Sequence, residues 1–224
     1  MNLGKNFKGF LIAIEGIDGC GKSSLSESLI SELNNLGFET VKTKEPGATQ
    51  LGQYLRDILQ NRTFDIDDKA EFLLFAADRA QHMHQVVIPA LQSNKIVISD
   101  RMADSSLAYQ GYARGLNIDI INKINDCATH SIKPDLTIYL KIDYQTAISR
   151  VKHRYNKNEQ ELTHFEKEKE EFFKKVITGF DNIFKIKDKD KVLIIDGTQN
   201  QNTIILQTLE HILDKIKIKK KLNE

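Results

Sequence analysis

The segment from Gly16 to Ser23, Gly-Ile-Asp-Gly-Cys-Gly-Lys-Ser, has the residue types that bind phosphate groups. It follows the apolar run 10–14 and precedes a helical pattern, which is the strand, loop and helix context of a P-loop. The glycines let successive N–H groups face one concavity, and the start of the helix adds positive potential. The segment therefore predicts binding of a nucleoside triphosphate. The predicted triphosphate-binding residues are Gly16, Ile17, Asp18, Gly19, Cys20, Gly21, Lys22, Ser23 and Ser24.

Two pairs of polar residues have the chemistry for phosphoryl transfer. Lys22 would reach the β- and γ-phosphates, and the Ser23 hydroxyl would ligate Mg²⁺. Asp100 and Arg101 follow the apolar run 96–98, which places them at the carboxyl end of another strand beside the P-loop. Asp100 is a predicted Mg²⁺ ligand, directly or through water, and Arg101 a predicted clamp for an acceptor phosphate. The alternative is a structural salt bridge at a strand end.

Short apolar runs alternate with longer helical patterns along the chain. This alternation is typical of a parallel sheet covered by helices on both faces, so we expect a doubly wound α/β fold. The predicted strands are 10–14, 40–43, 96–99, 136–142 and 192–195.

Two helices have recognisable ends in the sequence. The first presents leucines at helical spacing over 25–36 and ends before Gly37, where a C-terminal cap belongs. The second opens at Asp68, with Glu71 three residues later as in a capping box, and runs toward Pro89, where a break is expected.

Composition excludes several classes of partner. The chain has 224 residues, 40% of them hydrophobic, which predicts a single domain over 1–224. Its 32 basic and 31 acidic side chains nearly cancel, which argues against a nucleic-acid partner. The longest apolar stretch, 72–77, is far shorter than the ~20 residues that span a bilayer, and 1–9 lack a signal core. Cys20 and Cys127 make no disulfide framework. We expect a cytoplasmic protein without membrane association.

A P-loop alone does not separate kinases from switch GTPases and motor ATPases. Switch GTPases carry an Asn-Lys-x-Asp run on a late strand, whereas the nearest run here, 122–125, is Asn-Lys-Ile-Asn in a helical pattern. Motor ATPases are usually larger. A small-molecule kinase fits best, and a P-loop switch or regulator without phosphotransfer is the alternative.

Beyond the P-loop, the chain resembles the thymidylate kinase family over nearly its whole length. The resembling segments are 10–24, 44–49 (Lys-Glu-Pro-Gly-Ala-Thr), 74–79 (Leu-Phe-Ala-Ala-Asp-Arg), 100–101 with 105–111, and 134–140. The resemblance implies transfer of the γ-phosphoryl group of ATP to dTMP, with Mg²⁺. It also implies a P-loop nucleoside monophosphate kinase fold with a five-stranded parallel sheet, and a homodimer. A kinase for another nucleotide or deoxynucleoside is the nearest rival.

The same resemblance assigns the acceptor site. Phe75 and Arg79 are four residues apart on one helix, so they share a face. In the family pattern the aromatic ring stacks on thymine and the arginine bonds its exocyclic oxygen; the alternative is a core ring and a solvated arginine. One serine of 105–106 should contact the base, and Tyr109 should exclude a ribose 2′-hydroxyl. The predicted dTMP-binding residues are Asp18, Lys44, Pro46, Phe75, Arg79, Arg101, Ser105, Ser106, Tyr109 and Gln110.

Two acceptor-side positions carry further expectations. The family usually has arginine before Glu-Pro-Gly, so Lys44 keeps the charge but loses bidentate phosphate contact. We expect a weaker or adapted clamp there. Asp18 matches the family carboxylate that contacts the acceptor 3′-hydroxyl, with a helix-dipole partner as the alternative.

A lid is expected at about 150–163. The polar stretch 150–161 predicts a mobile loop. Some relatives place a catalytic arginine in the P-loop at position 19, and others carry their basic residues in the lid; Gly19 places this chain in the second group. Arg150 and Arg154 are the predicted lid cations, with a solvated basic loop as the alternative.

The region after the lid departs from the family pattern. Relatives often carry Asp-Arg where this chain has Thr163-His164, so either Arg154 substitutes or catalysis is slower. Glu166 matches a family carboxylate near the metal, and adenine should lie near Gly197 and Thr198 on fold grounds. The predicted catalytic residues are Lys22, Arg101, Asp18, Arg150 and Arg154, and the predicted metal ligands are Ser23, Asp100 and Glu166.

Overall fold

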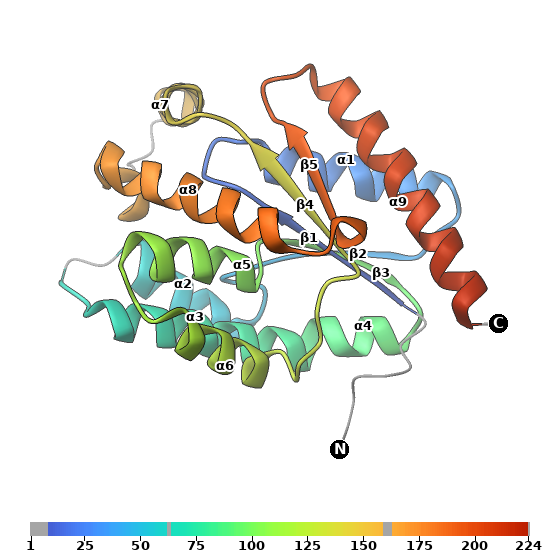
Figure 1. Cartoon of the computed structure of the whole chain (residues 1–224), viewed down its shortest axis with the longest axis horizontal. Helices are drawn as coiled ribbons and strands as arrows, with labels where there is room; N and C mark the ends of the chain where they lie inside the picture. Colours follow the sequence, from blue (N-terminus) through green and yellow to red (C-terminus); the bar gives the residue numbers. More distant parts are fainter. Residues whose placement is uncertain (1–8, 62–63, 159–162, 224) are drawn as a thin grey trace.

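A parallel sheet forms the centre of the molecule (Figure 1). The structure is a computed structural model that describes residues 9–61, 64–158 and 163–223. Within these ranges the sheet has five strands in the order β2-β3-β1-β4-β5, which confirms the predicted doubly wound fold. The strands are β1 (Phe10–Glu15), β2 (Thr40–Lys44), β3 (Ile96–Asp100), β4 (Leu136–Lys141) and β5 (Val192–Asp196), so each predicted strand is present.

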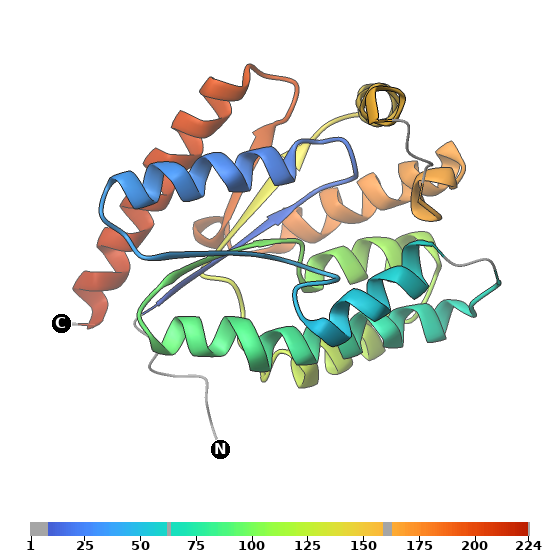
Figure 2. The same ribbon diagram turned by 180° about the vertical axis from the view of Figure 1, so that it is seen from behind.

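Helices cover both faces of the sheet. Figures 1 and 2, which view the molecule from opposite sides, show α1 and α9 on one face and α8 on the other. The α-helices are α1 (Lys22–Asn35), α2 (Gln50–Gln60), α3 (Asp68–His82), α4 (Ile88–Gln92), α5 (Ala103–Ser106), α6 (Ile118–Ala128), α7 (Tyr144–Asn158), α8 (Glu170–Ile186) and α9 (Gln201–Asn223). The π-helical segments are η1 (Met83–Val87) and η2 (Leu107–Ala113), and the 3₁₀ turns are η3 (Phe165–Lys167) and η4 (Lys189–Lys191). None of the helices in the described ranges is both long and apolar enough to cross a membrane.

The sequence signals for helix ends are mostly confirmed. Helix α1 stops just before Gly37, whose φ of +84° suits a residue without a side chain. Helix α3 begins at Asp68, but its N-cap is Asp67, which accepts from the backbone N–H of Lys69. The cap is therefore one residue earlier than predicted, and the predicted capping box was wrong, because Ala70 stands three residues after Asp67. The break expected near Pro89 takes the form of η1, after which the chain continues as α4.

The loop predicted for 150–161 was wrong for its first part. Helix α7 runs through residue 158, while 159–162 lie outside the described residues. Ala147 and Val151 are four residues apart and almost fully buried, 3% and 2% exposed. These two side chains, with Tyr144 packed on Phe173, are the apolar contacts of a largely polar helix. So few apolar residues gave a weak helical pattern in the sequence.

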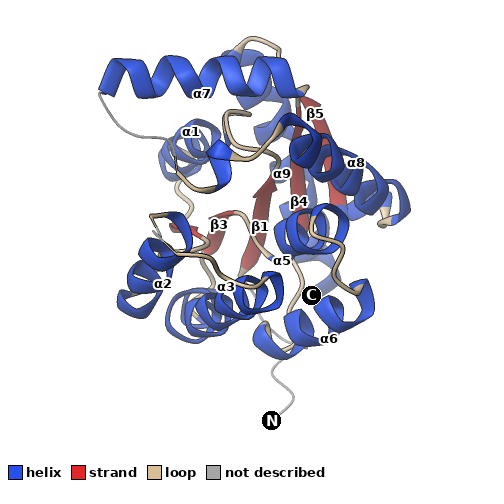
Figure 3. Ribbon diagram, turned by 90° about the vertical axis from the view of Figure 1, so that its left-hand side faces the viewer, coloured by secondary structure: helices blue, strands red, loops and turns tan. Residues whose placement is uncertain are grey.

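The carboxyl edge of the sheet gathers the predicted site. In the sheet register, Asp100 of β3 is level with Ile14 of β1 and with Lys44 of β2. The P-loop leaves β1 at this edge. Figure 3 looks onto it and shows α2, α3, α5, α7 and α8 arranged around it. The three central strands are buried on both faces, which explains their continuous apolar sequences.

Candidate active site

The P-loop depends on glycine for its backbone path. Gly16, Gly19 and Gly21 have φ values of +140°, +86° and +103°, which other residues rarely adopt. At Gly19 a β-carbon would lie 2.4 Å from the carbonyl oxygen of Ala147 on α7, closer than any real contact. The loop and α7 are therefore in direct backbone contact.

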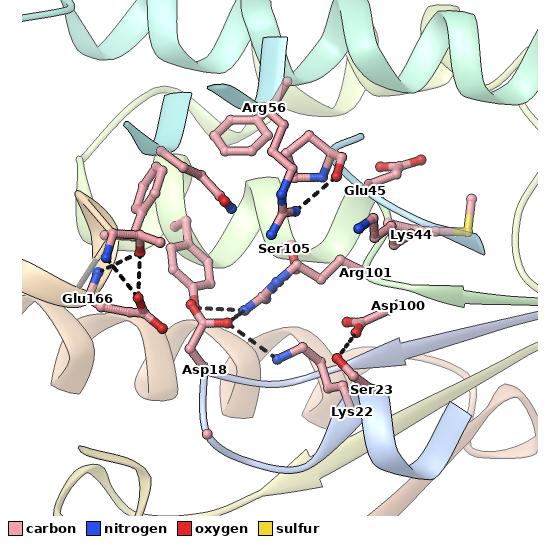
Figure 4. A pocket seen from close by; sticks show the side chains of 18 of the residues that line it. Asp18, Lys22, Ser23, Lys44, Glu45, Arg56, Asp100, Arg101, Ser105 and Glu166 are labelled. Atoms are coloured by element: carbon pink, nitrogen blue, oxygen red, sulfur yellow. Dashed lines mark hydrogen bonds and ion pairs between the residues drawn. The ribbon is translucent and has the colours of Figure 1, made fainter. Parts of the chain in front are cut away.

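The P-loop side chains meet the end of β3 (Figure 4). Lys22 is 6% exposed; its Nζ donates to the Ile17 carbonyl oxygen at 2.9 Å and lies 3.7 Å from Asp18 Oδ1. Ser23 Oγ donates to Asp100 Oδ2 at 2.7 Å. The hydroxyl and the carboxylate predicted to hold Mg²⁺ are thus in contact with each other. Hard oxygen atoms of this kind fit Mg²⁺, which usually takes one or two carboxylates together with substrate phosphates.

Arg101 links the P-loop to the acceptor side of the cavity. Its guanidinium donates to Asp18 Oδ1 at 2.7 Å and to the Gly16 carbonyl oxygen at 2.9 Å, and it lies over the Tyr109 ring at 5.1 Å. Its ion pair at this strand end is with Asp18 of the P-loop and not with the neighbouring Asp100. Burial raises the pKa of Asp18, but the charges of Arg101 and then Lys22 outweigh it and hold that pKa below its usual range.

Arg79 is buried, so the interpretation of it as a solvated helix residue was wrong. Its side chain is 2% exposed. Nε donates to Glu45 Oε2 at 2.8 Å, and NH1 donates to Ser106 Oγ at 3.1 Å and to Asn125 Oδ1 at 2.6 Å. Phe75, one turn earlier on α3, lines the same cavity and packs against Phe165 with ring centroids 5.8 Å apart. The predicted pair therefore shares one cavity wall.

Helix α5 and segment η2 supply further lining of the cavity. Ser105 Oγ accepts from Arg101 NH1 at 3.0 Å, and the Tyr109 hydroxyl accepts from Arg101 NH2 at 3.3 Å. Gln110 Nε2 donates to Glu71 Oε1 at 3.0 Å. The guanidinium and the two hydroxyls predicted to contact acceptor therefore hold one another in place.

The predicted lid residues are held on the other side of the P-loop. Arg154 NH2 donates to Glu166 Oε1 at 2.8 Å, and Thr163 Oγ1 donates to Glu166 Oε2 at 2.7 Å. Arg150 NH1 donates to the Gly197 carbonyl oxygen at 2.9 Å, which brings a lid cation to the predicted adenine region. Across the described ranges, no three His, Cys, Asp or Glu side chains gather as a metal-binding group.

One cavity of about 460 Å³ unites these groups. Its lining includes most predicted site residues: Asp18, Gly19, Gly21, Lys22, Ser23, Ser24, Lys44, Pro46, Phe75, Arg79, Asp100, Arg101, Ser105, Ser106, Tyr109, Gln110, Arg150, Arg154 and Glu166. The predicted residues outside the lining are Gly16, Ile17, Cys20, Gly197 and Thr198. The lining residues that sequence reasoning missed are Glu45, Arg56, Gln60, Met102, Thr163 and Phe165.

Comparison with known proteins assigns the family. The family model described as thymidylate kinase matches residues 14–207. The chain belongs to the thymidylate kinase family. It is 40% identical over 203 residues to a thymidylate kinase of Thermosipho melanesiensis, covering 91% of this chain and 96% of the relative. It is 38% identical over 213 residues to one of a Geobacillus species, covering 93% and 98%. The crystal structure of the Ehrlichia chaffeensis thymidylate kinase superimposes with a TM-score of 0.74 at 29% identity, over 92% of this chain and 98% of that one.

In this member of the thymidylate kinase family, Arg56 lies beside Lys44. Position 44 is the one at which the family resemblance leads us to expect arginine. Arg56 NH1 donates to the Pro46 carbonyl oxygen at 3.0 Å (Figure 4). Partial burial and then the charge of Arg56 lower the pKa of Lys44. The sequence held one signal for Arg56: it stands four residues after Gly52 and so shares its helix face. Gly52 is buried, which places that face inward.

Proposed function

We propose that this chain is a thymidylate kinase that transfers the γ-phosphoryl group of ATP to dTMP, giving ADP and dTDP. One observation carries the proposal: a single cavity holds the P-loop lysine at one end and the Phe75–Arg79 pair at the other. Arg101 contacts residues of both ends, through Asp18 and Tyr109. Placing a donor and an acceptor in one desolvated site is the main requirement of phosphoryl transfer.

The proposed mechanism relies on position and charge. The P-loop N–H groups and Lys22 hold the triphosphate, and Arg101 holds the acceptor phosphate so that an oxygen of it faces the γ-phosphorus. That oxygen is already anionic and needs no general base. Arg150 and Arg154 approach the migrating group from α7 as the proposed lid closes, and they offset the negative charge that spreads over its oxygens.

We also propose that Ser23 and Asp100 hold Mg²⁺, which their oxygen atoms and mutual contact fit. Mg²⁺ held there would supply positive charge that offsets the charge of the donor phosphates. Glu166 as a further ligand stays a prediction, since it bonds Arg154 and Thr163.

Base recognition is proposed to follow the residue types in the cavity wall. Phe75 offers a ring face for stacking on thymine, and Arg79 offers donors and no acceptor, which suits an exocyclic oxygen and disfavours an amino group at the same place. Tyr109 is proposed to lie under the deoxyribose and exclude a 2′-hydroxyl.

Steady-state ADP release with varied acceptors tests the function. dTMP should give the highest kcat/KM among dTMP, dUMP, dCMP, dGMP, AMP and thymidine. A clear preference for another acceptor would overturn the assignment in favour of a different nucleotide kinase. Tight ATP or GTP binding with no acceptor-dependent ADP release would favour a P-loop switch.

A homodimer is the proposed assembly, and exposed apolar side chains support it. Leu51, Tyr54 and Ile58 of α2 are 45%, 64% and 38% exposed, and Leu73 of α3 is 51% exposed. Apolar side chains gathered on two adjacent helices are typical of a surface that another protein covers. Sedimentation of the protein and of Tyr54→Glu tests this: the wild type should be dimeric and the variant shifted to monomer. A monomeric wild type would contradict it.

We further propose a cytoplasmic location, because both cysteines are free.

A further inference from the structure

Glu15, the last residue of β1, is a buried carboxylate outside the cavity lining. It is 0% exposed. Oε1 accepts the backbone N–H of Met102 at 2.8 Å, and Oε2 accepts the Ser105 hydroxyl at 2.5 Å. One carboxylate therefore ties together both ends of the short segment that follows Arg101.

Arg101 has a backbone conformation that needs such support. Its φ of +73° lies in the left-handed region, which is strained for a non-glycine residue and persists only where neighbours fix it. Its N–H donates to the Ile14 carbonyl oxygen at 2.9 Å, and its carbonyl oxygen accepts from Ser99 Oγ at 2.7 Å. The next N–H, that of Met102, goes to Glu15. The backbone on both sides of Arg101 is thus fixed, and Glu15 supplies the contact on the C-terminal side.

Ser105 carries the effect of Glu15 to the guanidinium. A serine hydroxyl has one hydrogen, and here it is given to Glu15 Oε2. Toward Arg101 NH1, 3.0 Å away, the Ser105 oxygen therefore presents lone pairs. This is the polarity that a guanidinium requires, since it can only donate.

We propose that Glu15 is a positioning residue that fixes the Arg101 guanidinium for the acceptor phosphate. The inference rests on the proposed function, because it needs Arg101 to hold that phosphate. Glu15 lies outside the cavity lining and acts through the Met102 N–H and the Ser105 hydroxyl.

Glu15→Gln tests the role, because glutamine keeps the shape and loses the symmetric pair of acceptors. With the variant, kcat/KM for dTMP should fall about 10- to 100-fold, since a clamp displaced by a fraction of an ångström loses alignment. The dissociation constant of ATP should stay within about twofold. Glu27→Gln, at an exposed position of α1, is the matched control and should behave as wild type.

ATP binding separates positioning from general damage. Glu15 directly precedes the P-loop, so a merely disturbed β1 would weaken ATP as much as dTMP. Equal losses for both nucleotides, or a dTMP efficiency within about twofold of wild type, would overturn the proposal.

A double-mutant cycle with Arg101→Ala gives the decisive readout. If Glu15 acts through Arg101, the Glu15→Gln loss should shrink below about twofold in the Arg101→Ala background. An undiminished loss there would mean a structural role only. If Glu15→Gln fails to fold, Ser105→Ala replaces it in the same cycle. This variant removes the hydroxyl that connects Glu15 with Arg101 and keeps the Glu15 carboxylate. A Ser105→Ala loss that persists without Arg101 would count against the proposal.

Isothermal titration calorimetry with dTMP distinguishes a failure of the proposed function from a failure of the proposed role of Glu15. A wild-type protein that neither binds dTMP nor releases ADP with it would reject the proposed function. An active wild type whose Glu15→Gln variant binds dTMP unchanged would reject only the role of Glu15.

Discussion

The two ends of the cavity hold their arginines differently. On the acceptor side, Arg79 is 2% exposed and bonds Glu45, Ser106 and Asn125 from three separate segments. On the lid side, Arg154 is 53% exposed and bonds Glu166. The acceptor-side cation is enclosed by the protein before any ligand arrives, whereas about half of the lid cation's side chain faces solvent.

The difference suits the two tasks. Discrimination between bases needs donors whose direction does not change, since a fixed donor rejects a mismatched partner. Charge stabilisation during transfer is needed only when both substrates are present, and a lid can supply it by closing. The comparison therefore predicts that acceptor-side substitutions cost stability and specificity, and lid substitutions cost turnover alone.

Lys22→Ala should have the largest effect on turnover, because Lys22 is proposed to hold the donor triphosphate. It lies beside Asp18, which links the P-loop to Arg101 on the acceptor side. We expect kcat to fall roughly 10³-fold, since a charge-stabilising donor is lost while the fold is kept. Rapid-quench or coupled assays would measure it. Lys42→Ala, an exposed lysine of β2, is the control, and near-normal turnover in a folded Lys22→Ala would contradict the P-loop assignment.

Arg79→Met should destabilise the fold by about 3 kcal/mol or more, because the buried Glu45 carboxylate is left without its main counter-charge. Denaturant unfolding measures this, and dTMP binding should weaken as well. Adding Glu45→Gln should recover much of the stability without restoring dTMP affinity. A stable Arg79→Met variant would contradict the proposed difference between the two sides. The acceptor side would then not depend on the buried hydrogen bonds of Arg79 for its stability.

Asp78 tests the electrostatic balance of the same network. Its Oδ1 accepts the Gly47 N–H at 3.0 Å, and its Oδ2 has no hydrogen-bond partner among the described residues. Burial and then the charge of Glu45 raise the pKa of Asp78 to about 6, against the opposing charges of His82 and Arg79.

Because the folded pKa of Asp78 exceeds the unfolded value, the folded protein binds more protons at this group between pH 4 and 6. The stabilisation is therefore fully present below about pH 4 and is lost as the pH rises through about 6. Relative to Asp78→Asn, the unfolding free energy of the wild type should fall by about 2 kcal/mol over that range. A difference that does not change with pH would show that Asp78 is not perturbed.

Arg154→Ala should have the smallest effect. We expect kcat to fall about tenfold with little change in KM for dTMP, because the contact strengthens only in the transition state. The melting temperature should hold, since the side chain is half exposed. Lys174→Ala, another exposed cation, is the control. A change in KM alone would make Arg154 a binding residue and remove the contrast with Arg79.

The strands and the meeting of the P-loop with the end of β3 could be predicted from the sequence. Both follow from continuous apolar runs and from the parallel arrangement of the strands. The strands appear where those runs lie, and Ser23 meets Asp100 because β1 and β3 end at one edge. Helix α7 beyond residue 150 was missed because Ala147 and Val151 make only a narrow apolar stripe.

Two functional features were missed for a different reason. Arg56 of α2 lines the cavity and donates to the carbonyl oxygen of Pro46, ten residues earlier. Its place four residues after Gly52 is a local signal for an inward face, but that spacing does not predict the contact with Pro46. Glu15 is the last residue of an apolar strand. A carboxylate at that place in a sequence predicts the start of a loop and not a buried contact. Its importance depends on Met102 and Ser105, which are distant in sequence and adjacent only in the fold.

The tight approach of Gly19 to Ala147 also limits how this enzyme could have changed over evolution. Any side chain at position 19 would collide with the α7 backbone, and φ of +86° would strain it as well. An arginine could therefore enter the P-loop at position 19 only if α7 moved away near Ala147. In this chain, therefore, a substitution of Gly19 alone would not give a P-loop arginine without a shift of the neighbouring α7 backbone.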